Sequence, residues 1–172
     1  YHYGVPKEIG TNGMDDDQSW TYRFNPCGRD KWEEEDVVTL VPGRYGATLS
    51  WLATEGTDLE QTDGIGATAA ISIMEAKRKD PFFLAVGFYR PHTPYVAPQA
   101  YFDMYTPDQM TPPFTPEGDR YDMSPLAFFY KAEQRALPDE TKRKARLAYA
   151  ASISYMDAQF GRLLDALERL DL

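Results

Sequence analysis

An unbroken apolar run in the middle of the chain, Phe82-Phe83-Leu84-Ala85-Val86-Gly87-Phe88, constrains the fold more than any other feature of the sequence. Polar and apolar residues do not alternate within it, and Asp80-Pro81 comes directly before it. Short runs of this kind are typical of strands that are buried on both faces, as in a parallel sheet covered by helices. The run therefore predicts a core strand of an α/β fold at residues 82–88.

A helix is expected before this strand. Thr62 or Asp63 is a suitable N-cap, and apolar residues then recur at helical spacing: Ile65, Ala69, Ile73 and Ala76. The basic run Lys77–Lys79 suits the negative end of a helix. Asp80-Pro81 would end it, because proline cannot continue a helix.

A second helix is expected over residues 139–170. An apolar stripe marks its second half: Met156, Phe160, Leu163, Leu164, Leu167 and Leu170. Helix, buried strand, long loop and helix together indicate an internal portion of an α/β sandwich with a mostly parallel central sheet.

The rest of the chain is expected to be irregular. Residues 1–61 are interrupted by many glycines and prolines. Residues 89–138 hold nine of the 13 prolines and also several aromatic residues that would need cover. So long a segment without secondary structure is unusual inside a compact domain, which favours a functional surface loop on the active-site side over a linker. All 172 residues are assigned to one domain segment.

Composition and charge exclude several classes of partner and site. The formal charge of -9 argues against nucleic acid, which is bound by basic surfaces. No apolar run has the length of a membrane span. The acidic clusters Asp15–Asp17 and Glu33–Asp36 predict no metal site, because adjacent carboxylates point apart and calcium needs six or more oxygens from several directions.

The chemistry is expected near His92, which follows the predicted strand in Tyr89-Arg90-Pro91-His92-Thr93-Pro94. Ligands of open α/β sheets bind at the carboxyl ends of the strands, and an imidazole there can protonate a leaving oxygen. Arg90 offers donors that match sulfate or phosphate oxygens. The alternative is a loop histidine bonded to a carbonyl. Cys27 has no base at a telling spacing and favours an inert thiol.

Three stretches resemble the iduronate-2-sulfatase-like branch of the sulfatase family. Pro81–Tyr95 is similar to the family's "PFFLAVG" followed by a basic residue, Pro-His and a second proline. Tyr149–Leu164 resembles its "Y-A-S-S-Y-D-Q-G-R-L-L" helix. Tyr1–Trp20 is similar to the stretch after a "G-K-x-aromatic-His" motif. These matches cover most of the chain in the family's order.

The resemblance implies an alkaline-phosphatase-like α/β/α sandwich and hydrolysis of a sulfate ester, such as a sulfated sugar or polysaccharide. It implies two catalytic histidines, His2 acting on a formylglycine hydroxyl and His92 on the sulfate and the leaving alcohol, which would share one pocket. Arg90 is expected to bind substrate because of its donors, independently of the resemblance. Formylglycine and calcium are expected outside this segment, so the isolated segment should be inactive, and no residue here is expected to ligate metal. Periplasmic, secreted or lysosomal-type proteins are typical of the family.

Two other functions fit the same residues. A phosphodiesterase or phosphonate hydrolase of the same superfamily would differ in its nucleophile, which this segment does not include. A non-catalytic binding or structural fragment is the third possibility. Gly161 and Arg162 match the family as well, but packing explains them better: Gly161 would allow a helix to approach the sheet closely, and Arg162 would pair with a carboxylate. The oligomeric state is not predicted.

Overall fold

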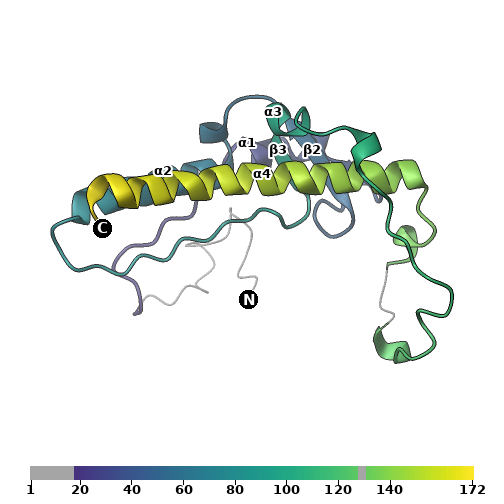
Figure 1. The fold of residues 1–172 in the computed structure, drawn as a ribbon. Coiled ribbons are helices and arrows are strands. Elements are labelled where there is room, and N and C mark those ends of the chain that lie inside the picture. Colours follow the sequence, from purple (N-terminus) through teal and green to yellow (C-terminus); the bar gives the residue numbers. More distant parts are fainter. Residues whose placement is uncertain (1–17, 128–130) are drawn as a thin grey trace.

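The computed structural model describes residues 18–127 and 131–172, and two long helices and a small sheet dominate it (Figure 1). The helices are α2 (Thr62–Lys77) and α4 (Asp139–Leu170). The strands are β1 (Val38–Thr39), β2 (Ser50–Thr54) and β3 (Tyr95–Pro98). The shorter helices are α1 (Arg29–Trp32), α3 (Gln99–Phe102) and the 3-10 helices η1 (Glu34–Asp36), η2 (Asp58–Glu60), η3 (Pro107–Gln109), η4 (Pro125–Ala127) and η5 (Ala132–Gln134).

The sheet has the order β1-β2-β3 and is mixed. β1 runs antiparallel to β2, with Val38 opposite Trp51, and β2 runs parallel to β3, with Trp51 opposite Tyr95. All three strands come from segments that were expected to be irregular. In the part of the chain described here, the mostly parallel sheet of the sequence analysis is therefore a three-stranded sheet with one parallel and one antiparallel pair.

The prediction of a buried strand at residues 82–88 is wrong for this structure. No strand of the described residues pairs with this segment, and the side chains of Phe82, Phe83 and Val86 are 38%, 82% and 37% exposed. A strand exists through hydrogen bonds to its neighbours, which apolar composition cannot supply. The segment instead packs Leu84 and Phe88 against the core that α2 and α4 share.

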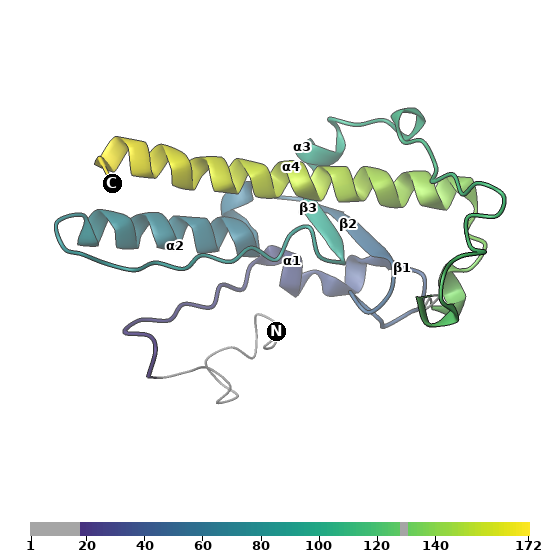
Figure 2. The ribbon, with the colours of Figure 1, turned by 60° about the horizontal axis from the view of Figure 1, so that its bottom comes forward.

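Helix α4 connects the two halves of the structure. Its C-terminal half runs beside α2 and parallel to it, and its N-terminal half lies over the sheet (Figure 2). Small buried side chains allow the two helices to approach closely: Ala67 and Ala70 of α2 face Leu163 and Ala166 of α4. Ala148 and Ala151 of α4 are fully buried as well. Close packing of this kind stabilises the pair by burying apolar surface.

The buried face of α4 coincides only in part with the stripe that its apolar residues predicted. Phe160 and Leu164 of that stripe are 47% and 49% exposed, whereas Tyr155 and Gln159 are almost completely buried. The burial of polar Gln159 is possible because its amide donates to the Asp58 carboxylate at 2.7 Å. The helix therefore meets α2 and the sheet with small and polar residues together with Leu163, Leu167 and Leu170 of the predicted stripe.

The first turn of α2 is the point where the site is built. Gln61 is the N-cap, so Thr62 and Asp63, each expected to cap the helix, lie inside its first turn and are buried. Their side chains do not cap the helix and can form contacts with other segments.

Among the described residues, no helix combines the length and the apolar composition that crossing a membrane requires.

Candidate active site

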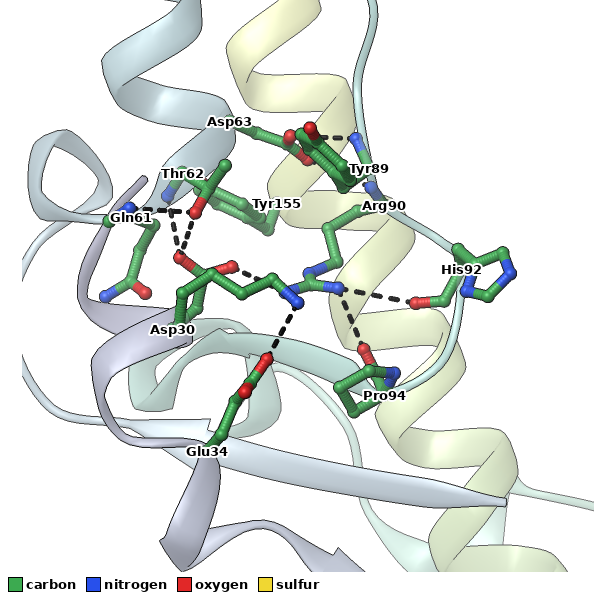
Figure 3. A network of polar contacts seen from close by, with 12 residues as sticks. Asp30, Glu34, Gln61, Thr62, Asp63, Tyr89, Arg90, His92, Pro94 and Tyr155 are labelled. Carbon is green, nitrogen blue, oxygen red and sulfur yellow. Dashed lines mark hydrogen bonds and ion pairs between the residues drawn. The ribbon is translucent and has the colours of Figure 1, made fainter. Parts of the chain in front are cut away.

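His92 lies in a short loop, residues 89–94, that leads from the extended segment 82–88 into β3. The His92 side chain is exposed, but Arg90 and Pro94 on either side of it are buried. The peptide bonds before Pro91 and Pro94 are both cis. Figure 3 shows the imidazole on the outer side of the loop, pointing away from the guanidinium of Arg90. A histidine held in this way can reach a ligand outside the chain while its backbone stays fixed.

A hydrogen bond of 2.6 Å joins Nδ1 of His92 and the carbonyl oxygen of Thr93. Because a carbonyl oxygen only accepts, Nδ1 must carry the proton. The neutral ring therefore has its lone pair on Nε2, which is the nitrogen that can take up a proton and return it. His92 is thus a loop histidine bonded to a carbonyl, which was the alternative to a catalytic histidine in the sequence analysis. The same bond also gives the ring the geometry of a proton-transfer group, so the two interpretations are compatible.

Arg90 turns inward, and its guanidinium is held by protein groups. Nη2 donates to Oδ2 of Asp30 at 2.6 Å, and Nη1 donates to the carbonyl oxygen of Pro94 at 2.9 Å and to that of His92 at 3.4 Å. The Arg90 and Asp30 side chains are 3% and 4% exposed. The role of Arg90 in substrate binding stays a prediction, and these contacts engage its guanidinium with a carboxylate and two carbonyl groups of the chain itself.

The carboxylate of Asp63 holds the start of the loop. Its two oxygens accept the backbone N–H groups of Tyr89 at 2.8 Å and Arg90 at 3.0 Å. Burial raises the pKa of Asp63, and the hydrogen bonds and the nearby Arg90 charge oppose that rise without cancelling it. Burial and the Asp63 and Asp30 charges also raise the pKa of Tyr89. The beginning of α2 thus fixes the backbone directly before Pro91.

Asp30 connects the same network to α1. Its Oδ1 accepts the backbone N–H of Thr62 at 2.8 Å and the Thr62 hydroxyl at 2.6 Å, and that hydroxyl accepts the Gly28 N–H at 2.9 Å. A side chain on Gly28 would overlap the backbone of Gln61 and Thr62, so this contact requires glycine. Figure 3 shows Asp30, Thr62 and Arg90 meeting between α1, α2 and the loop.

A hollow of about 420 Å³ lies beside the His92 loop. Thr93 and Tyr95 line it on one side, Gly46 and Thr48 on another, and Lys131 adds a positive charge. Thr93 is itself anchored there, because its hydroxyl donates to the Gly46 carbonyl at 2.9 Å. The Thr48 hydroxyl donates to the Glu133 carboxylate at 2.8 Å, so the loop borders a space at which Lys131 and Glu133 bring charges of opposite sign.

The structure brings together some of the residues selected from the sequence and leaves one untested. His92 and Arg90 share the loop, whereas His2 lies outside the described residues, so its place relative to His92 stays a prediction. Asp30 was not found from the sequence, because nothing near it marks a partner sixty residues away. Asp63 was expected from the sequence as a possible helix cap. That expectation located its carboxylate at the start of α2, but it did not predict the hydrogen bonds of the carboxylate to the loop.

The described residues do not fit a metal or a formylglycine nucleophile. Within residues 18–127 and 131–172, no group of three His, Cys, Asp or Glu side chains could hold a metal ion. The carboxylates of Asp30 and Asp63 are engaged with Arg90, Thr62 and backbone N–H groups. Cys27 is a partly buried thiol in Asn25-Pro26-Cys27-Gly28-Arg29, which is not a C-x-P-S-R-like sequence.

The family called Sulfatase matches residues 9–172 of this sequence. The chain belongs to the sulfatase family. A protein named sulfatase from Formosa agariphila is 33% identical over 151 residues, which are 83% of this chain and 30% of that protein. Human iduronate 2-sulfatase is 30% identical over 192 residues, covering 95% of this chain and 33% of the human protein. The choline-sulfatase of Rhizobium meliloti is 26% identical over 180 residues, covering 97% and 33%.

The sulfatase relatives are much longer than this chain, which spans about a third of their length. The likeness to the iduronate 2-sulfatases extends over nearly the whole chain, as the resemblance of Pro81–Tyr95 and Tyr149–Leu164 to that branch implied. Membership of the sulfatase family implies an alkaline-phosphatase-like fold, and the described residues contribute a mixed α/β part of it.

Proposed function

We propose that this chain is an internal segment of the catalytic domain of a longer sulfatase that hydrolyses a sulfate ester of a sugar or polysaccharide. The family match over residues 9–172 supports the reaction class. The likeness to iduronate 2-sulfatase, whose name specifies a sulfated uronic acid, supports a sugar as the substrate. Since the chain spans about a third of that relative, the reaction is assigned to the longer protein.

We propose that His92 contacts the sulfate and protonates the leaving alcohol oxygen. The observation that carries this role is the exposed imidazole, on a loop whose flanking residues are buried, with Nδ1 bonded to the Thr93 carbonyl. In the protonated ring, Nε2–H is then the donor that can face a substrate. The hollow beside Thr93 and Lys131 is where the alcohol portion of the ester would lie.

We propose that calcium and a formylglycine nucleophile act in this sulfatase and are contributed by other parts of the longer protein. The described residues lack a metal-binding cluster, and Cys27 is not in a matching sequence. The second histidine, His2, is proposed to approach the same pocket as His92.

We also propose that the longer domain is an alkaline-phosphatase-like α/β/α sandwich in which the exposed apolar side chains of residues 82–88 are covered. Phe83 alone is 82% exposed, and Phe82 and Val86 are each more than one-third exposed. Neighbouring large apolar side chains at such exposure indicate a surface that is buried in a larger assembly. This covering surface belongs to the fold and not to the substrate site.

The test is a kinetic assay of the longer protein, with its His92→Ala variant, on a sulfated uronic acid, choline sulfate, an aryl sulfate and a phosphodiester. We expect hydrolysis of the sulfated sugar, and a loss of turnover of about 10²–10⁴-fold in His92→Ala with metal content unchanged. Lys144→Ala, which removes an exposed ion pair on α4, is the control. Preference for the phosphodiester would contradict the proposed reaction class, and preference for choline sulfate would contradict a sugar as the substrate.

The isolated chain should be inactive in the same assay.

A further inference from the structure

Arg90 closes the His92 loop from inside. Its Nη1 donates to two carbonyl oxygens of the loop, those of His92 and Pro94, while Nη2 donates to Asp30 outside the loop. We propose that Arg90 is a positioning residue that, together with Asp30, fixes the direction in which His92 is presented. The catalytic consequence of this assignment rests on the proposed function of His92.

The two carbonyls that Arg90 binds flank a third that orients the imidazole. The Thr93 carbonyl, which accepts from Nδ1 of His92, lies between the His92 and Pro94 carbonyls along the chain. Fixing the peptide groups on both sides limits the rotation of the Thr93 carbonyl. Arg90 therefore acts on the protonation pattern of His92 through the backbone, without touching its ring.

Asp30 supplies the fixed point for Arg90. Oδ2 of Asp30 accepts from Arg90, and Oδ1 accepts from the N–H and the hydroxyl of Thr62. The carboxylate therefore cannot rotate without losing the two hydrogen bonds to Thr62. Both charged side chains are almost fully buried, so the ion pair is screened very little by solvent. The orientation of the guanidinium thus follows from α1 and the first turn of α2.

A guanidinium is needed for this geometry. Its planar fork directs Nη1 and Nη2 to different partners at once, whereas a lysine ammonium is a single point charge on a flexible stem. Lysine at position 90 could keep the attraction to Asp30 but would not hold the Pro94 carbonyl at the same time. The loop would remain attached through Asp63 and through the Thr93 hydroxyl on Gly46, so the change loosens the loop rather than releasing it.

The roles of positioning and substrate binding predict different results. If Arg90 bound sulfate, Arg90→Lys would weaken inhibition by inorganic sulfate and would raise KM. If Arg90 positions His92, sulfate inhibition stays close to that of the wild type, and kcat falls by about 10²-fold for a sulfated sugar, since a misplacement of about 1 Å has that effect. The fall is smaller for an activated aryl sulfate, whose leaving group needs less protonation.

The experiment compares the longer protein with four variants: Arg90→Lys, Asp30→Asn, His92→Ala and the double variant Arg90→Lys/His92→Ala. Arg162→Lys is the matched control, because Arg162 binds the Gly64 carbonyl and Thr68 of α2 but does not touch the loop. In nitrogen-15-labelled protein, the His92 signal is identified by its absence from His92→Ala, and its shifts report which ring nitrogen carries the proton. Circular dichroism verifies folding.

We expect the Nδ1–H form in the wild type and Arg162→Lys, and a shift toward the Nε2–H form in Arg90→Lys and Asp30→Asn. The double variant should lose no more activity than His92→Ala, because Arg90 acts through His92. An unchanged tautomer in both loop variants overturns the assignment, and so does failure of both to fold while Arg162→Lys folds. Wild-type turnover in His92→Ala with a shifted tautomer would instead reject the proposed catalytic role and leave the positioning role standing.

Discussion

The phenolic oxygen of Tyr155 on α4 accepts a hydrogen bond of 2.8 Å from the backbone N–H of Gly64 on α2, 91 residues away in the chain. Both groups are buried, and the N–H belongs to the first turn of α2, where a helix has no internal acceptor for it. Burial and the charge of Asp63 raise the pKa of the Tyr155 hydroxyl, so it stays protonated. This contact attaches α4 to the turn that carries Thr62 and Asp63.

Tyr155→Phe is expected to lower the free energy of unfolding by about 1–3 kcal/mol, because the buried N–H of Gly64 loses its acceptor. Tyr121→Phe is the control, since the Tyr121 side chain is 91% exposed. Urea unfolding followed by circular dichroism measures both. Equal stability of the two variants would mean that the Tyr155 hydroxyl contributes nothing net to the packing of α4.

Gly64→Ala is expected to lower the free energy of unfolding by about 1–3 kcal/mol or more, because overpacking strains a fixed backbone. The new methyl group would overlap the carbonyl oxygen of Asp58, which cannot move independently of η2. Gly161→Ala is the matched control on α4. Among the described residues, no atom outside its chain neighbours and the adjacent backbone of α4 lies within 4 Å of its new methyl group, so Gly161→Ala should raise the free energy of unfolding by about 0.5–1 kcal/mol through helix propensity. Thermal unfolding that ranks the two variants in the opposite order would contradict this packing.

Asp63→Asn should change the pH dependence of stability. The folded-state pKa of Asp63 is raised by burial, so the folded chain binds more protons at this site than the unfolded chain between the usual and the raised pKa. The stability that Asp63 contributes is therefore fully present below about pH 4 and decreases as the pH rises through that window. The asparagine side chain of the variant does not titrate, so the advantage of the wild type should shrink with rising pH.

The measurement for Asp63 is urea unfolding of both proteins from acid to neutral pH. In acid the variant should be less stable by about 1–3 kcal/mol, since one of the two N–H groups of the loop loses its acceptor. Asp157→Asn, an exposed position on α4, serves as the control and should stay within about 0.5 kcal/mol of the wild type at each pH. If the difference in the free energy of unfolding between wild type and Asp63→Asn grew with rising pH, the pKa of Asp63 would be lowered by folding and not raised.

Hydrogen exchange should separate residues 82–88 from the rest of the core. In this chain the segment belongs to no strand of the described residues, so its amides are expected to exchange much faster than those of Val96 and Ala97 in β3. In the longer sulfatase, where we propose that the segment is covered, its exchange should be slowed. Slow exchange in this chain, or equally fast exchange in both proteins, would reject the proposed covering.

The sequence by itself determined the two long helices and the family. Helical periodicity and Asp80-Pro81 located α2 and the region where it ends. The helix expected over residues 139–170, marked by an apolar stripe in its second half, is α4 with the bounds that the structure has. The order of the motifs indicated the sulfatase family, which the comparison over residues 9–172 shows. These features depend on residues close together in the chain, where spacing and backbone chemistry act directly.

Tertiary structure decided which surfaces meet. Gly161 was expected to allow close packing and faces open space among the described residues, while Arg162, expected to pair with a carboxylate, donates to the Gly64 carbonyl, Gln159 and Thr68. The apolar run at 82–88 could not show whether a neighbouring strand would pair with it. The inward turn of Arg90 depends on Asp30, because a buried charge requires a partner and the partner is brought near only by folding. The spacing of residues along a short stretch of sequence cannot predict a contact between residues that lie 60 positions apart, as Arg90 and Asp30 do.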